Sequence, residues 1–143
     1  RFERTFLRVL SDERCHVPFV YFPVVAPANS AIIIYCHGSG STLNNVYQFA
    51  YDLATTFKIA VLAYDYTGDG ESEKEFVSYE SDLNLVVSWV IRKGYKMDRI
   101  ILAGFSLGSY SALSMEGVMP RLLISPVCGI VPFLEGEAKR FGG

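Results

Sequence analysis

Residues 100–108 read IILAGFSLG, and this stretch decides the fold. Its first four residues are an apolar run, which is typical of a strand buried on both faces of a sheet. Two glycines then flank Ser106 in the spacing G-x-S-x-G, and residues 107–115 favour a helix. The spacing alone is weak evidence, since it occurs by chance in roughly one chain of this length in twenty. Between a buried strand and a helix, however, it is typical of a sharp turn that presents a reactive serine.

The two glycines have a steric reason to be there. Such a turn lifts the serine hydroxyl above the sheet, and the chain on either side must pass very close. Gly104 and Gly108 have no Cβ atom to collide at that point. We therefore predict that Ser106 is a catalytic nucleophile and that the backbone N–H of Leu107 stabilises a developing oxyanion. The alternative is a structural serine at an ordinary strand-to-helix turn.

The segments around this turn alternate between strand-like and helix-like patterns. This order indicates an α/β fold, with a mostly parallel sheet and helices on both faces. Continuous apolar runs predict buried strands at residues 31–36, 59–63, 100–103 and 121–124. Apolar stripes predict helices at residues 43–57 and 79–93. Pro18 and Pro23 interrupt a further strand-like segment, residues 17–25, and because proline cannot donate to a ladder we expect this strand at the edge of the sheet.

Composition excludes several classes of protein. Half of the 143 residues are apolar and 14% are aromatic, which is enough for a packed core and argues against a disordered chain. The 13 basic and 15 acidic residues give a net charge of −2, which argues against nucleic-acid binding. Three cysteines in no regular spacing favour a reducing compartment. Neither a signal peptide nor an apolar run of membrane-spanning length is visible, so we expect a cytoplasmic protein.

A second glycine-rich turn follows the first of the buried strands. His37 and Gly38 come directly after residues 31–36, and Ser39 and Gly40 continue the turn. In this position the backbone N–H just after His-Gly, that of Ser39, would be the second donor to the oxyanion. The alternative is a glycine-rich turn that binds nothing.

Taken in order, these motifs resemble the α/β-hydrolase superfamily over essentially the whole chain. His37-Gly38 follows one strand, residues 65–72 (DYTGDGES) follow the next, and the serine turn follows the third. The D-Y-x-G-x-G-x-S pattern, the IILAGFSLG stretch and the later LLISP (residues 122–126) are most similar to the branch of cytosolic protein depalmitoylases and serine-aminopeptidase-like hydrolases. The resemblance implies a serine hydrolase of esters or thioesters that works through an acyl-enzyme. Its substrate would be a small molecule or an acylated protein, and a lipid-like substrate would bring the protein close to membranes.

The partners that a catalytic serine needs are missing from the sequence. A serine hydroxyl requires a base, usually a histidine oriented by a carboxylate. The resemblance implies that both follow Ser106, after two further strands, whereas His16 and His37 both precede it. We expect His37 to brace its turn, His16 to lie far from Ser106, and Asp65 to hydrogen-bond the glycine loop that follows it. No cysteine has a histidine partner and no cluster has metal-ligand spacing, so we expect neither a cysteine hydrolase nor a metal or cofactor.

We therefore expect residues 1–143 to be the N-terminal part of a single, longer hydrolase domain, with residues 135–143 as a flexible tail or the start of a cap. A sheet that ended at residues 121–124 would leave an apolar strand as an unprotected edge. Two other interpretations stay open. One is a hydrolase fold without a complete triad that only binds ligands, and the other is a serine peptidase. The sequence leaves the oligomeric state undetermined.

Overall fold

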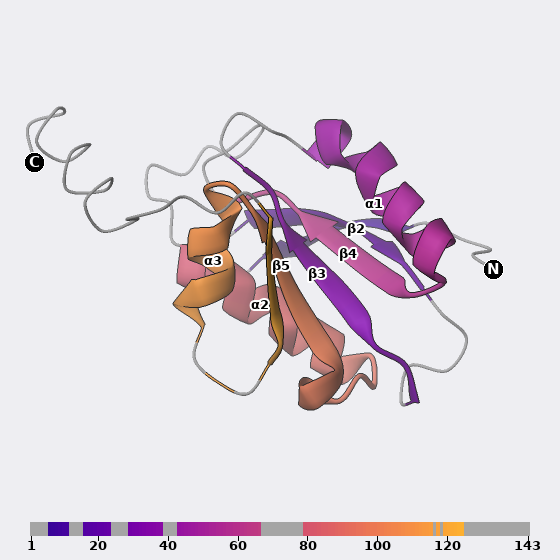
Figure 1. The fold of residues 1–143 in the computed structure, drawn as a ribbon. Helices are drawn as coiled ribbons and strands as arrows, with labels where there is room; N and C mark the ends of the chain where they lie inside the picture. The colour runs from indigo at the N-terminus through magenta and orange to yellow at the C-terminus, as the bar shows by residue number, and fades with distance from the viewer. Residues whose placement is uncertain are drawn as a thin grey trace, which may run out of the picture.

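A computed structural model describes residues 6–11, 16–23, 29–38, 43–66, 79–115, 117 and 119–124. Six strands in these residues form one sheet (Figure 1). They are β1 (Phe6–Ser11), β2 (His16–Phe22), β3 (Ile32–Cys36), β4 (Ala60–Tyr64), β5 (Ile100–Phe105) and β6 (Arg121–Ile124). The helices are α1 (Leu43–Phe57), α2 (Tyr79–Arg92) and α3 (Gly108–Ser114), and η2 (Met97–Arg99) is a 3-10 turn. The predicted α/β class is confirmed.

The strands lie in the order β1-β2-β4-β3-β5-β6. The neighbours β4, β3, β5 and β6 are parallel, while β2 is antiparallel to both β1 and β4. All five residues of β3 and of β4 are buried, as their apolar runs predict. After β3 the chain enters α1, and after β5 it enters α3, which covers the opposite face. Ligands of open α/β sheets bind where adjacent strands lead to opposite faces, so a ligand site is expected at the carboxyl ends of β3 and β5.

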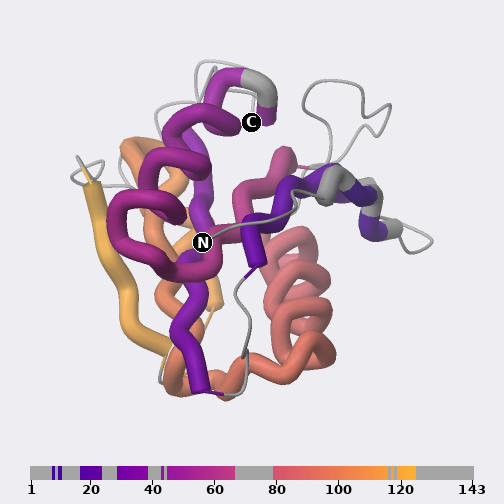
Figure 2. The backbone as a smooth tube through the Cα atoms, turned by 90° about the vertical axis from the view of Figure 1, so that its right-hand side faces the viewer, coloured from indigo at the N-terminus to yellow at the C-terminus, as the bar shows by residue number. Residues whose placement is uncertain are grey.

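Helices cover both faces of the sheet, and Figure 2 shows α1 and α2 on its opposite sides. One apolar layer lies between the sheet and α1, which contributes Leu43, Val46, Ala50 and Ala54. The other layer lies beneath α2 and α3, which contribute Leu83, Val86, Val87, Trp89, Val90 and Ala112. None of the helices in the described part of the chain combines the length and apolar character that a bilayer crossing requires.

The predicted edge strand does not lie at the edge, so that prediction was wrong. β2 lies between β1 and β4, because residues 6–11 form a strand that we did not predict. Pro18 is tolerated there since it lies just beyond the β2–β4 ladder, which begins at Phe19. The Pro18 carbonyl oxygen still accepts a hydrogen bond from the N–H of Asp65, at 3.0 Å. Pro23 follows the last residue of β2 and therefore removes no ladder bond.

Helix α3 is only seven residues long, and a guanidinium group holds its C-terminal end. Arg121, the first residue of β6, donates hydrogen bonds to the backbone carbonyl oxygens of Ala112, Met115, Gly117 and Met119. Ala112 lies in the last turn of α3 and Met115 is its C-cap, where carbonyl groups have no partner within the helix, while Gly117 and Met119 follow the helix. Arg121 thus fixes the helix that follows the serine turn.

We expect Arg121→Met to lower the free energy of unfolding by about 2 kcal/mol, because the carbonyl groups lose a charged donor while the apolar stem is kept. Urea denaturation measures this loss. Arg99→Met is the matched control, since Arg99 is exposed in η2. We expect the control to change stability by less than about 0.5 kcal/mol. Equal losses in the two variants would contradict the helix-end role of Arg121.

Candidate active site

The turn between β5 and α3 holds Ser106 in the left-handed backbone conformation. Its φ is +51°, and Lys58 is the only other non-glycine residue with positive φ in the described part of the chain. This conformation costs a residue with a Cβ atom roughly 1–2 kcal/mol. Because β5 ends at Phe105 and α3 begins at Gly108, only two residues reverse the chain. Ser106 therefore lies at the apex of a sharp, strained turn.

Neither of the flanking glycines admits a side chain. A Cβ atom on Gly104 would lie 2.6 Å from the Gly108 carbonyl oxygen and 2.7 Å from Ser109 Cα. A Cβ atom on Gly108 would overlap the backbone carbonyl of Cys36 and lie 2.7 Å from the His37 carbonyl oxygen. These neighbours are backbone atoms, which cannot move aside without shifting α3 or the end of β3. The contacts give a direct steric reason for both glycines.

The turn after β3 lies against the serine turn, since β3 and β5 are neighbours in the sheet. A Cβ atom on Gly38 would lie 3.2 Å from the Phe105 carbonyl oxygen and 3.4 Å from Ser106 Cβ. Gly38 thus lets the backbone approach the Ser106 side chain closely. Ser39, whose N–H we predicted as an oxyanion donor, lies outside the described residues.

The other predicted donor, the N–H of Leu107, follows Ser106 directly. The neighbouring amides are engaged: Ser106 N–H donates to the Ile124 carbonyl oxygen and Ser109 N–H to that of Ser106, each at 3.0 Å. Among the described residues the Leu107 N–H donates to no backbone carbonyl. This leaves it available to a negatively charged oxygen next to Ser106.

His37 is 1% exposed, and both of its ring nitrogens have partners. Nε2 lies 3.0 Å from Oδ1 of Asp65, and Nδ1 lies 2.8 Å from the carbonyl oxygen of Gly38. The carbonyl oxygen of Gly38 only accepts hydrogen bonds, so Nδ1 is the donor in that bond. His37 therefore has no free nitrogen with which to take a proton from Ser106. The Asp65 carboxylate contacts this ring, while the glycine loop that we expected it to bind lies outside the described residues.

Tyr66 also belongs to this site. It is part of the D-Y-x-G-x-G-x-S pattern of residues 65–72, but we predicted no role for it. Its hydroxyl donates to the His37 carbonyl oxygen at 2.6 Å, and its ring centroid lies 4.5 Å from that of His37. Tyr79 at the start of α2 contacts the ring of Tyr66 at 5.0 Å and that of Tyr110 in α3 at 5.6 Å. These rings connect the turn after β3 with the first turns of α2 and α3.

The remaining candidates for a base or a nucleophile are poorly placed. His16 begins β2, which lies three strand spacings from β5. That is roughly 14 Å, too far for a direct hydrogen bond to Ser106. Burial raises the pKa of the Cys36 thiol to about 12, against the opposing effect of a hydrogen bond with the Tyr64 hydroxyl 3.4 Å away. Cys36 is therefore a neutral thiol at physiological pH.

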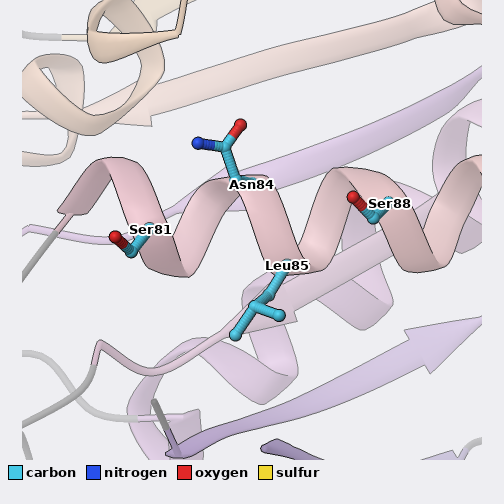
Figure 3. Close-up of a pocket in the computed structure, with 4 residues that line it drawn as sticks. All are labelled: Ser81, Asn84, Leu85 and Ser88. Atoms are coloured by element: carbon cyan, nitrogen blue, oxygen red, sulfur yellow. The ribbon is translucent and has the colours of Figure 1, made fainter. Parts of the chain in front are cut away.

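The described residues contain no group of three or more His, Cys, Asp or Glu side chains that could hold a metal ion. A hollow on α2 is lined by Ser81, Asn84, Leu85 and Ser88 (Figure 3). All four residues belong to one helix, and none is part of the turns that surround Ser106. The candidate residues Ser106, His37 and Asp65 directly follow the carboxyl ends of β5, β3 and β4.

Comparison with known families agrees with this geometry. The family model described as serine aminopeptidase, S33, matches residues 27–137, which is well over half of the chain. The chain belongs to this family. Membership in the S33 family confirms the predicted α/β-hydrolase superfamily and the serine-aminopeptidase-like branch within it. A search of curated proteins finds no match.

Solved structures resemble this S33-family chain in fold. Esterase LipW from Mycobacterium marinum has a TM-score of 0.62 and 24% identity, over 87% of this chain and 44% of its own. A thermostable carboxylesterase cloned from a metagenomic library has a TM-score of 0.68 and 19% identity, over 89% and 48%. A putative hydrolase from Agrobacterium vitis has a TM-score of 0.61 and 19% identity, over 96% and 59%. The chain thus spans about half the length of these structures.

Proposed function

We propose that the protein containing this chain is a serine hydrolase that cleaves esters or thioesters through an acyl-enzyme, with Ser106 as the nucleophile. The observation that carries the proposal is the +51° φ of Ser106 between two glycines that admit no side chain. Strained backbone of this kind persists only where the surrounding structure enforces it, and it clusters at catalytic sites. Here the enforcing contacts come from β3 and the start of α3.

The chemistry follows from this placement. Oγ of Ser106 attacks the carbonyl carbon as a general base takes its proton, and the carbonyl oxygen becomes an oxyanion. The N–H of Leu107 and the N–H that follows Gly38 donate to that oxyanion. Collapse of the tetrahedral intermediate breaks the ester or thioester bond and expels the alcohol or thiol, which receives the proton. Water then attacks the acyl group on Oγ, and the acid and free Ser106 are released.

The general base and its carboxylate partner come, in this proposal, from further chain of the same domain. Both ring nitrogens of His37 are engaged and His16 lies three strand spacings away, so neither serves. The solved structures of this fold are about twice as long as the chain, which leaves room for both groups. Residues 1–143 are then the N-terminal part of the domain, with residues 135–143 leading into a tail or cap.

The substrate class rests on three kinds of support. The esterase and the carboxylesterase among the compared structures favour an ester. The D-Y-x-G-x-G-x-S pattern of residues 65–72 favours a thioester or another lipid-like acyl group, on a small molecule or a protein, in the cytoplasm and near membranes. The S33 description names an aminopeptidase, so peptide hydrolysis is the second candidate.

Labelling with a fluorophosphonate tests the nucleophile, because this reagent phosphonylates an activated serine. We expect the full-length protein to be labelled and Ser106→Ala to remain unlabelled. Ser88→Ala, a change of an exposed serine in α2, is the matched control and should label like the wild type. Equal labelling of Ser106→Ala and wild type would overturn the proposal, and a folded wild type without labelling would favour a binding-only protein. The values of kcat/KM for an acyl ester, an acyl thioester and an aminoacyl amide then rank the substrate classes.

A further inference from the structure

Two half-buried tyrosine rings lie beside the Ser106 turn, on the side of α2 and α3. Tyr110 is in the first turn of α3, where its N–H donates to the Leu107 carbonyl oxygen at 3.0 Å. Tyr79 is the first residue of α2, and its ring centroid lies 5.6 Å from that of Tyr110. Because α3 follows β5 directly and the Tyr79 ring contacts Tyr66 just after β4, both rings lie at the carboxyl edge of the sheet. They share this edge with the candidate nucleophile.

The contacts of these rings hold them in place. The Tyr66 ring is 3% exposed, and its hydroxyl bond to the His37 carbonyl oxygen fixes its position. Tyr79 meets the Tyr66 ring edge-on at 5.0 Å, with an angle of 85° between the ring planes. Tyr110 meets Tyr79 in the same manner, at 82°. Edge-to-face pairs of this kind are favourable and directional, so the exposed parts of Tyr79 and Tyr110 form a preorganised apolar surface.

The position of the general base decides which end of an ester would lie against this surface. The base passes the Ser106 proton to the leaving group, so the leaving group must lie next to it. His37 is the described histidine beside these rings, and both of its ring nitrogens are engaged. The base in the proposed function comes instead from further chain. The leaving group then points away from the two tyrosines, and the acyl group, which stays on Oγ of Ser106, lies on their side.

We infer that Tyr79 and Tyr110 form a tyrosine wall that contacts the acyl group next to Ser106 and selects apolar acyl groups of several carbon atoms. The inference rests on the proposed function and adds the residues that determine its acyl specificity. Burial of methylene groups against the rings is favourable, whereas a charged group would lose its hydration there. An acetyl group is too short to bury much of the wall, so the selection grows with acyl length.

The ratio of kcat/KM for an octanoyl ester to that for an acetyl ester of the same alcohol measures this selection in the full-length protein. Both values come from one preparation, so the fraction of folded protein cancels. We expect the wild type to prefer the octanoyl ester and Tyr110→Ala to lower the ratio by about 10-fold, the size of effect that apolar pocket contacts produce. Tyr110→Phe keeps the ring and should keep the wild-type ratio. An unchanged ratio in Tyr110→Ala would overturn the inference.

Tyr51 in α1 provides a matched control. It is also a tyrosine that meets another ring edge-on, that of Phe22 at 5.9 Å, and it is 42% exposed. Helix α1, however, lies on the opposite side of the sheet from α2 (Figure 2). We expect Tyr51→Ala to keep the wild-type ratio. A fall in Tyr51→Ala equal to that in Tyr110→Ala would refute a specific contact with the wall.

A second series of substrates separates the acyl group from the leaving group. The acyl group is kept as acetyl, and the alcohol is changed from methanol to octanol. We expect Tyr110→Ala to leave the preference between these two esters unchanged. A larger effect in this series than in the acyl series would place the leaving group against the tyrosines and overturn the inference.

The outcomes distinguish this inference from the function on which it rests. A full-length protein that neither labels at Ser106 nor hydrolyses any acyl substrate refutes the proposed function. A protein that labels and turns over, and whose Tyr110→Ala variant keeps the wild-type acyl preference, refutes the tyrosine wall alone.

Discussion

Gly108→Ala is expected to lower the free energy of unfolding by about 3 kcal/mol or more, because overpacking against rigid backbone is among the most destabilising single changes. The added Cβ atom would overlap the backbone carbonyl of Cys36 in the central strand β3. Relief requires that α3 move away from β3, and this movement would also displace Ser106. Urea denaturation and activity should therefore both report the change.

Leu113→Ala is the matched control for this substitution. Leu113 belongs to the same short helix but is 51% exposed, so its truncation removes little buried surface. We expect it to cost less than about 1 kcal/mol. If Gly108→Ala had the same free energy of unfolding as Leu113→Ala, that result would contradict the close packing of α3 against β3.

Ser106→Ala is expected to lower kcat by at least about 10⁴-fold, because removal of the nucleophile leaves only binding and oxyanion stabilisation. Its stability should stay near that of the wild type, since the Cβ atom and the strained φ of +51° are both retained. Ser106→Gly should be equally inactive but more stable than Ser106→Ala by about 1 kcal/mol, because glycine adopts positive φ without steric cost.

Lys58 provides the control for the strain argument. Its φ is +53°, directly after α1, where no catalytic role is proposed. We expect Lys58→Gly to gain a similar amount of stability while its activity stays at the wild-type level. The strain at Ser106 would be contradicted if Lys58→Gly were more stable than the wild type while Ser106→Gly were less stable than Ser106→Ala.

Much of the sheet was predictable because burial on both faces leaves a local signal. The runs that became β3 and β4 are apolar at every position, and such runs fit only the centre of a sheet. β1 was missed although four of its six residues (FLRVLS) are apolar; its place at the sheet edge follows from pairing with β2, which the sequence does not show. The edge prediction for β2 failed because a proline's position relative to the ladder cannot be read before the partner strands are known.

The candidate site likewise has one part that the sequence predicts and one part that it does not. The spacing of Gly104, Ser106 and Gly108 is a pattern of neighbouring residues, so the sequence alone indicated a sharp turn. The contacts of Gly108 with Cys36 and His37 could not be predicted, because these residues lie far away in the sequence. The contact of His37 with Asp65 joins positions 28 residues apart. It exists because Cys36 and Tyr64 are paired in the parallel ladder of β3 and β4, which brings the two following residues together. Such pairing is a property of the folded sheet, and no local pattern encodes it.

The most direct test of the proposed function is mass spectrometry of the full-length protein, quenched in acid during turnover of a slowly deacylated ester. We predict a burst that places one acyl group on the tryptic peptide 100–121, with fragmentation locating it at Ser106. Hydrolysis at the same rate with no acylated peptide, or with the acyl group on another residue, would contradict Ser106 as the nucleophile.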